Sequence, residues 1–365
     1  MNRTGLLSLL LVVSLDVSAL VATSAAQGRG GPPPIKSPEI GADQRVTFRL
    51  RAPNAKEVTV SLAGKQLPMQ KDAEGVWSLT TDQMTPDVYA YSLVVDGASI
   101  TDPSNRQAET SFTGFRSMFM VPGPAAWLPS PGVPRGAIAR HAFHSAVADD
   151  DRDFFVYTPP GYDARRAQPY PVLYLLHGLG DDAERWMNGG AANHILDNLI
   201  AQKKAVPMVV VTPLGYGVSG GPAGARSAEM FPGYAKILFE EVMPTVDKAY
   251  NVSRNREQRA IAGLSMGGAE TLYVGLNNLD KFAWIGAFSS AQVMWNSAMP
   301  NAGDGAARGA GAGRGAGAPV PMMDEAVFAK MFPNLDAKAN SRLRMLWITC
   351  GTSDSLIGVK FANSP

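Results

Sequence analysis

The stretch Ala260-Ile-Ala-Gly-Leu-Ser-Met-Gly-Gly268 decides how the second half of this chain folds. It contains a G-x-S-x-G motif centred on Ser265, with apolar residues before it and a helix-compatible run, residues 267–276, after it. Strand, sharp turn and helix in this order form a nucleophile elbow, in which the two glycines let strand and helix approach closely. The pattern predicts Ser265 as a nucleophile. The alternative is a glycine-rich turn that buries an inert serine.

An acyl-transfer site also needs hydrogen-bond donors for a developing oxyanion. Met266, directly after the serine, supplies one backbone N–H at the start of a helix. The second donor is expected from an earlier loop after a strand, and His177-Gly-Leu-Gly180 follows an apolar strand. We predict Leu179 as this donor, with Gly180 as the next choice and an ordinary glycine turn as the alternative. The side chain of His177 is expected to brace the loop rather than to act as the catalytic base.

The orienting carboxylate is expected after the serine, at the end of a later strand. Asp354 meets this condition because Cys350-Gly-Thr-Ser-Asp354 continues from an apolar strand at residues 344–349. Aspartate is also favoured at helix N-termini, so an N-cap is the alternative role for this residue. The sequence predicts Asp354 as the acid of a catalytic triad.

The catalytic histidine is the member of the triad that we expect to be missing from this chain. In this arrangement the order along the chain is serine, acid, histidine. Eleven residues follow Asp354 and none is a histidine, while all four histidines precede Ser265: His141, His144, His177 and His194. We therefore expect a chain that is truncated at its C-terminus, nearly inactive and poorly soluble, whereas a longer version is active. The alternative is that an upstream histidine serves as the base.

Composition bounds the remaining possibilities. A length of 365 residues suggests two domains, and 45% hydrophobic with 18% charged residues supports a sizeable core. The formal net charge of +1 gives no support for a nucleic-acid partner. The single cysteine, Cys350, excludes an intrachain disulfide. Arg3, an apolar run and Ser24-Ala-Ala26 are typical of a cleaved signal peptide, so a secreted or periplasmic protein without stable membrane insertion is expected. An uncleaved membrane anchor is the alternative.

The hydrophobic pattern changes along the chain. Short alternating strands are expected first, at residues 46–50, 58–62, 76–79 and 88–95. Continuous apolar strands that alternate with helices follow, which predicts a doubly wound α/β sheet. Pro244 should kink or split the helical run 234–250. The Gly/Ala-rich run 301–318 is interpreted as a tolerated insertion in preference to a lid.

These changes define five segments. They are a signal peptide (1–26), a flexible linker (27–40), a small all-β immunoglobulin-like sandwich (41–122), a second linker (123–140) and an α/β-hydrolase domain, incomplete at its C-terminus (141–365). We expect residues 41–122 to fold separately from the hydrolase domain.

Two resemblances extend this interpretation. Phe48-Arg-Leu-Arg-Ala-Pro-Asn-Ala55, Gly75-Val-Trp77 and Tyr89-Ala-Tyr-Ser-Leu-Val-Val-Asp-Gly97 resemble immunoglobulin-like early-set domains related to carbohydrate-binding module family 48. Trp77, Tyr89 and Tyr91 are candidate sugar contacts there, although core or interdomain packing is the favoured role for these aromatic side chains.

The second half resembles the secreted esterases of carbohydrate esterase family 1, which are similar to esterase D and to enterochelin esterases. Three stretches carry the resemblance: Tyr157-Thr-Pro-Pro-Gly-Tyr-Asp163, Leu175-Leu-His-Gly-Leu-Gly-Asp-Asp182 and Arg259-Ala-Ile-Ala-Gly-Leu-Ser-Met-Gly-Gly268. It implies a triad of Ser265, Asp354 and a later histidine, without metal or cofactor. It also implies an acylated carbohydrate, feruloyl or acetyl, or a small ester as the substrate. Siderophore-ester hydrolysis and acyl transfer stay open, as does a non-catalytic carbohydrate-binding protein on a hydrolase scaffold.

Overall fold

The computed structural model describes residues 34–112, 114–123, 127–218, 221, 230–290 and 325–351. The described residues from Lys36 onward belong to one compact unit. The predicted signal peptide, the Gly/Ala-rich run 301–318 and Asp354 lie outside the described residues. Within the described part of the chain, no helix has the length and apolar character needed to cross a membrane.

The N-terminal part is a sandwich of two mostly antiparallel sheets. One sheet has the order β1 (Glu39–Ile40), β2 (Val46–Arg51), β6 (Val76–Thr80), β5 (Gln70–Lys71). The other has the order β4 (Lys65–Pro68), β3 (Val58–Leu62), β7 (Asp87–Val95), β10 (Gly114–Val121), β9 (Ala108–Ser111), with β8 (Ala98–Ile100) paired to β7. The four strands predicted from alternation are β2, β3, β6 and β7. Buried and half-buried residues alternate along β2 and β3, as expected for a sheet with one face in a core.

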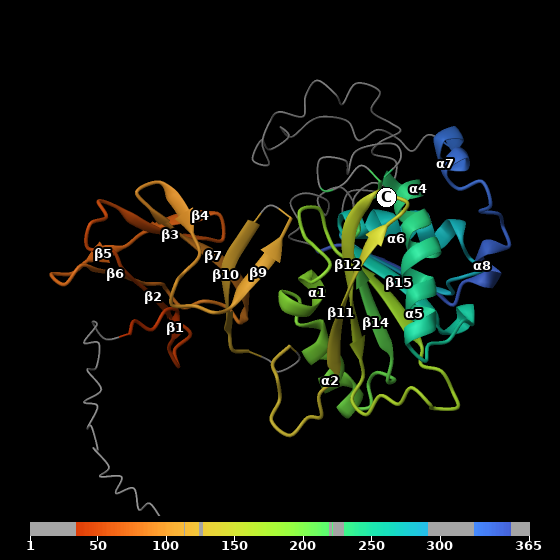
Figure 1. The fold of residues 1–365 in the computed structure, drawn as a ribbon, viewed down its shortest axis with the longest axis horizontal. Coiled ribbons are helices and arrows are strands. Elements are labelled where there is room, and N and C mark those ends of the chain that lie inside the picture. The colour runs from red at the N-terminus through yellow and green to blue at the C-terminus, as the bar shows by residue number, and fades with distance from the viewer. Residues whose placement is uncertain are drawn as a thin grey trace, which may run out of the picture. The chain divides into compact units, whose positions relative to one another are not determined.

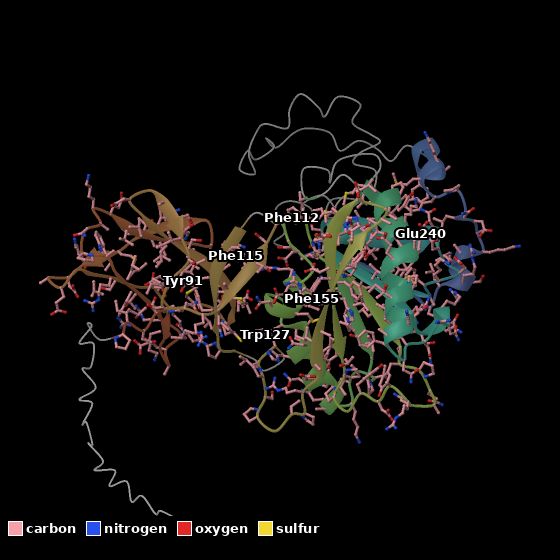
Figure 2. All side chains as sticks on the ribbon, in the orientation of Figure 1. Tyr91, Phe112, Phe115, Trp127, Phe155 and Glu240 are labelled. Carbon is pink, nitrogen blue, oxygen red and sulfur yellow. The ribbon has the colours of Figure 1, made fainter. Side chains whose placement is uncertain are left out.

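Aromatic rings fill the core of this sandwich. Tyr91 is 1% exposed and packs against Phe48, with ring centroids 4.7 Å apart (Figure 2). Its hydroxyl donates to Asp102, and the Trp77 indole N–H donates to the Ala52 carbonyl. Tyr89 stacks on a core phenylalanine at 5.4 Å. Trp77 and Tyr91 therefore lie in the core of the sandwich, and Tyr89 packs against that core.

The second half is a seven-stranded sheet covered by helices. The strand order is β11 (Ala137–Ser145), β12 (Asp150–Thr158), β14 (Val209–Pro213), β13 (Val172–Leu176), β15 (Arg259–Leu264), β16 (Trp284–Phe288), β17 (Met345–Thr349). The pairs from β14 to β17 are parallel, and β11 and β12 are added antiparallel. From β13 the chain adds β14 on one side of β13 in the sheet. It then adds β15, β16 and β17 in turn on the other side of β13. Ligands of open α/β sheets bind at the carboxyl ends of strands beside such a switch in direction.

Helices cover both faces of this sheet (Figure 1). Helices α1 (Arg185–Asn188) and α2 (Ala192–Ala201) pack on one face through a cluster that includes Met187 and Ala192. Helices α4 (Met230–Ile237), α5 (Met243–Ala249) and α6 (Met266–Asn277) pack on the other. The short helices α7 (Glu325–Met331) and α8 (Ala339–Arg342) precede β17. The predicted doubly wound α/β fold is confirmed.

Two predictions about where elements begin and end can be compared with the structure. The helical run 234–250 is split as expected, because a π-helical turn (Leu238–Val242) separates α4 from α5, where Pro244 lies in the first turn. By contrast, β11 begins at Ala137, inside the segment predicted as linker 123–140. This strand was missed because most of its side chains are exposed, so it lacks the apolar pattern of the strands inside the sheet.

Candidate active site

Ser265 lies in a strained turn between β15 and α6. Its backbone has φ 55° and ψ −112°, and non-glycine residues rarely adopt positive φ values. The Ser265 N–H donates to the carbonyl of Phe288 on the neighbouring strand β16 (3.0 Å), which fixes the turn. Strain of this kind clusters at functional sites. The strand, turn and helix required of a nucleophile elbow are therefore present.

The glycines after the serine permit close packing of the elbow against β13. A Cβ atom at Gly267 would lie 2.5 Å from the His177 carbonyl oxygen and 2.6 Å from that of Leu176. The Gly267 N–H donates to the same His177 carbonyl at 3.1 Å. Backbone atoms on both sides cannot move away from a side chain, so this position requires glycine.

The predicted oxyanion loop passes directly beside the serine. A Cβ atom at Gly178 would lie 3.7 Å from the Ser265 Cβ. The Gly180 N–H donates to the Tyr216 hydroxyl (2.8 Å), so it is not free to bind an oxyanion. Within the described residues, the N–H groups of Leu179 and Met266 have no hydrogen-bond partner. This arrangement favours Leu179 over Gly180 as the second donor.

His177 braces the loop, as expected from the sequence. Its side chain is 2% exposed; Nδ1 donates to the Gly178 carbonyl (2.8 Å), and Nε2 accepts from the Gly215 N–H (2.9 Å). Burial lowers the pKa of His177 to about 4. Both ring nitrogens of a neutral imidazole are therefore engaged in holding two loops together.

The other three histidines lie in separate environments. His141 bonds the Tyr250 hydroxyl (2.6 Å) and stacks on Phe154, His144 bonds Asp151 (3.0 Å), and His194 bonds Arg135 (2.8 Å). None of the four histidines hydrogen-bonds to Ser265.

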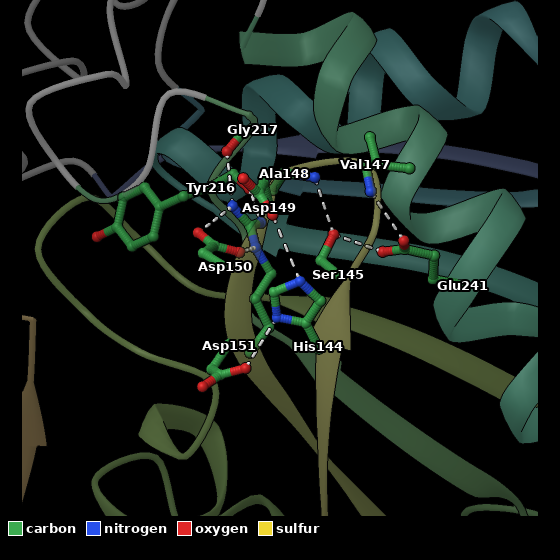
Figure 3. A network of polar contacts seen from close by, with 11 residues as sticks. His144, Ser145, Val147, Ala148, Asp149, Asp150, Asp151, Tyr216, Gly217 and Glu241 are labelled. Carbon is green, nitrogen blue, oxygen red and sulfur yellow. Dashed lines mark hydrogen bonds and ion pairs between the residues drawn. The ribbon is translucent and has the colours of Figure 1, made fainter.

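Tyr216 is a site residue that sequence reasoning missed. It is 1% exposed, and its hydroxyl accepts from the Gly180 N–H and donates to the Asp181 carbonyl (3.0 Å). The buried Arg152 holds its backbone, because the guanidinium donates to the carbonyls of Tyr216 and Gly217. Figure 3 labels these two acceptor residues. The available signal was Pro213-Leu-Gly-Tyr-Gly217, which follows a buried strand at the same sheet edge as the oxyanion loop.

Glu270 is a buried acid behind the same loop. It is 0% exposed, and neither carboxyl oxygen has a hydrogen-bond partner within the described residues. A Cβ atom at Gly215 would lie 2.9 Å from Glu270 Oε2 and 3.4 Å from His177 Nε2. Burial raises the pKa of Glu270 well above its ordinary value, because the charged form has lost its hydration. The protonated acid is thus the form that the fold favours.

In Glu270→Gln, the free energy of unfolding is expected to fall less with rising pH than it does in the wild type. A raised pKa means that the folded state holds a proton that the unfolded chain releases above about pH 4.3. The stabilising contribution is therefore present below that pH and is lost as pH rises through the folded-state pKa. As pH rises above about 4.3, the wild-type free energy of unfolding should fall more than that of the variant, measured by urea unfolding at a series of pH values.

The exposed Glu240 on the same side of the sheet provides a matched control (Figure 2). Glu240→Gln should follow the wild-type pH dependence. His177 acts in the opposite sense, because its lowered pKa removes stability as pH falls from about 6.5 toward 4. It is present in every variant, so its contribution cancels in the comparison. Parallel curves for Glu270→Gln and the wild type would show that Glu270 is ionised in the folded protein.

The end of β17 approaches the site through strand register. Leu264 pairs with Phe288, and Phe288 pairs with Thr349, so β15, β16 and β17 end at the same edge. Asp354 follows five residues later and lies outside the described residues, so its role stays a prediction. Within the described residues, no cluster of three or more histidine, cysteine, aspartate or glutamate side chains could hold a metal ion.

The sheet order and the strand–turn–helix at Ser265 define an α/β-hydrolase fold. The chain belongs to the family described as "Putative esterase", whose model matches residues 145–357. Residues 36–106 match the model of carbohydrate-binding module 48, the isoamylase N-terminal domain.

Curated relatives agree with this assignment, and a solved structure shares the fold. An endo-1,4-beta-xylanase/feruloyl esterase of Xylanibacter ruminicola is 34% identical over 270 residues, which cover 70% of this chain and 36% of the relative. Endo-1,4-beta-xylanase Y of Acetivibrio thermocellus is 28% identical over 194 residues, covering 50% and 17%. The chain thus spans about a third or less of the length of these relatives. The enterobactin esterase FES of Shigella flexneri shares the fold, with a TM-score of 0.52, 21% identity and coverage of 68% and 71%.

Proposed function

We propose that this protein is a secreted serine carboxylester hydrolase that removes feruloyl or acetyl groups from plant polysaccharide. One observation carries the chemistry: Ser265 lies in a strained elbow, beside two backbone N–H groups that have no partner within the described residues. A strained serine beside unpaired donors is the arrangement that acyl transfer requires.

The reaction follows from these positions. The Ser265 oxygen attacks the ester carbonyl carbon, and the carbonyl oxygen becomes an oxyanion held by the N–H groups of Leu179 and Met266. The catalytic base takes the Ser265 hydroxyl proton during the attack and gives it to the sugar oxygen as the bond between that oxygen and the carbonyl carbon breaks, which leaves an acyl-enzyme. Water then attacks the acyl-enzyme and gives a proton to the same base, which returns it to the Ser265 oxygen as the free acid leaves. The resemblance to carbohydrate esterase family 1 implies a histidine after Asp354 as this base. Asp354 is assigned as the carboxylate that orients the base. His177 is not assigned as the base, because both of its ring nitrogens are engaged.

The substrate class is supported by the relatives and by the N-terminal module. The Xylanibacter relative is named a xylanase and feruloyl esterase, and residues 36–106 match a carbohydrate-binding module. Secretion is supported by the composition of residues 1–26. Trp77 and Tyr91 are not assigned to sugar binding, because both are buried.

A substrate comparison tests the proposal. The longer version of the chain that is expected to be active, called the full-length protein from here on, should hydrolyse methyl ferulate or p-nitrophenyl acetate. It should release the same acid from acylated xylan oligosaccharides faster than it cleaves enterobactin. Preference for enterobactin would assign a siderophore esterase instead. Binding of xylan without hydrolysis of any of these esters would assign a carbohydrate-binding protein on a hydrolase scaffold.

A further inference from the structure

The end of strand β9 contacts the oxyanion loop directly. The Phe112 N–H, one residue beyond β9, donates to the Gly180 carbonyl (3.0 Å). The Phe112 ring packs edge-to-face on Tyr216, with centroids 5.0 Å apart. Both peptide groups of Gly180 are therefore engaged, its N–H by the Tyr216 hydroxyl and its carbonyl by Phe112. Gly180 has φ +90°, a conformation that few other residues adopt.

Further contacts join β9 to the segment that follows the loop. The Ala108 carbonyl accepts from the Asn188 side chain (2.7 Å), and the Thr110 hydroxyl donates to Glu184 (3.4 Å). Glu109 is 3% exposed and pairs with Arg185 of α1. Arg185 in turn lies 3.6 Å from the Asp181 carboxylate. The segment from Gly180 to Asn188 is thus bonded along its length to one strand of the N-terminal module.

These contacts bear on catalysis through the residue before Gly180. The Leu179 N–H belongs to the peptide group between Gly178 and Leu179. The next peptide group along the chain carries the Gly180 N–H, which is held by Tyr216, and Phe112 holds the Gly180 carbonyl one peptide group further on. Oxyanion donors act only when they are held in place before the reaction, because reorganisation during the reaction raises the barrier. Phe112 itself is 49% exposed, and the buried part of its ring lies on Tyr216.

We propose that Phe112 is a positioning residue for ester hydrolysis, and that the N-terminal module is part of the catalytic machinery through its hold on the oxyanion loop. This inference rests on the proposed function. Its distinctive consequence is an effect on turnover with small esters, which have no polysaccharide for a carbohydrate-binding module to recognise.

The test compares Phe112→Ala with Phe115→Ala in the full-length protein. Phe115 is 69% exposed on β10 of the same hairpin and provides the matched control. With p-nitrophenyl acetate, Phe112→Ala should lower kcat about 10-fold or more, below the 10²–10³-fold loss of a whole oxyanion donor. KM should stay within about 2-fold. Phe112→Tyr should restore kcat, because it keeps the ring on Tyr216, and Phe115→Ala should match the wild type.

Amide hydrogen exchange gives a second readout that needs no turnover. Peptides covering residues 178–181 should exchange faster in Phe112→Ala than in the wild type, while peptides from α6 stay unchanged. Tyr216→Phe, which removes the acceptor of the Gly180 N–H, should accelerate exchange in the same peptides.

The outcomes separate this inference from the proposed function. If the wild type hydrolyses no ester, the proposed function fails, and exchange at residues 178–181 alone decides the positioning role. Unchanged kcat or unchanged exchange in Phe112→Ala overturns the inference. A rise in KM confined to aromatic esters, at constant kcat, also overturns it, since Phe112 would then contact the substrate rather than position the loop.

Discussion

Ser265→Ala is expected to lower the kcat of the full-length protein for ester hydrolysis by about 10⁴–10⁶-fold, because the acyl-enzyme cannot form without the serine oxygen. The residual rate would come from substrate binding and from the N–H groups of Leu179 and Met266. Those two groups belong to the backbone and stay in place in the variant. The measurement is steady-state hydrolysis of methyl ferulate or p-nitrophenyl acetate, with burst-phase product release as a check for the acyl-enzyme.

The exposed Ser341, in α8, provides the control for this substitution. Ser341→Ala removes a serine hydroxyl of the same domain and should leave kcat unchanged. The hydroxyl of Ser265 has no hydrogen-bond partner within the described residues, so its loss should not lower stability. Full activity in Ser265→Ala, with unchanged stability, would remove Ser265 from the mechanism.

Gly267→Ala is expected to destabilise the protein by about 2–4 kcal/mol and to abolish hydrolysis. Helix propensity alone predicts the opposite sign, since alanine is favoured over glycine inside a helix by about 1 kcal/mol. The new methyl group would meet the backbone oxygens of Leu176 and His177 at 2.5–2.6 Å. Because neither can move without separating α6 from β13, the elbow and the oxyanion loop should move apart. The measurement is urea unfolding together with kcat.

Gly275, two turns later in the same helix, provides the matched control. A Cβ atom there would lie 2.8 Å from Cδ1 and 3.0 Å from Cγ1 of Ile285, and 3.3 Å from Cγ2 of Ile261, so it would meet side-chain atoms rather than backbone. Gly275→Ala should therefore change stability by less than about 1 kcal/mol, because propensity and packing nearly cancel. Equal effects of the two substitutions would mean that close approach to β13 does not decide the Gly267 position.

The elements predicted correctly share a strong burial pattern. β13 coincides with the apolar strand expected before His177, and β15 with the strand expected before Ser265. β3 was predicted to the residue by strict alternation. β4, β5 and β8 were missed because they are short and mostly exposed, so they leave no hydrophobic periodicity. The exposed β11 is held by its antiparallel ladder with β12 rather than by burial.

The site was predictable to the extent that local sequence determines it. The elbow at Ser265 and the loop at Leu179 depend on glycines and on strand order, which are visible in the sequence. Tyr216 was not, because its role depends on where a loop folds back over another strand. Glu270 lies within a helical pattern in which charged residues ordinarily face solvent, and only the packed structure shows that its carboxyl is buried.

Identification of the residue modified by a fluorophosphonate tests the central claim most directly, since only an activated serine reacts with such a probe. The full-length protein should take up one probe, and peptide mass spectrometry should place it on Ser265, with no labelling in Ser265→Ala. An adduct on a different residue, or an unmodified Ser265 in protein that hydrolyses esters, would contradict the assignment of Ser265 as the nucleophile.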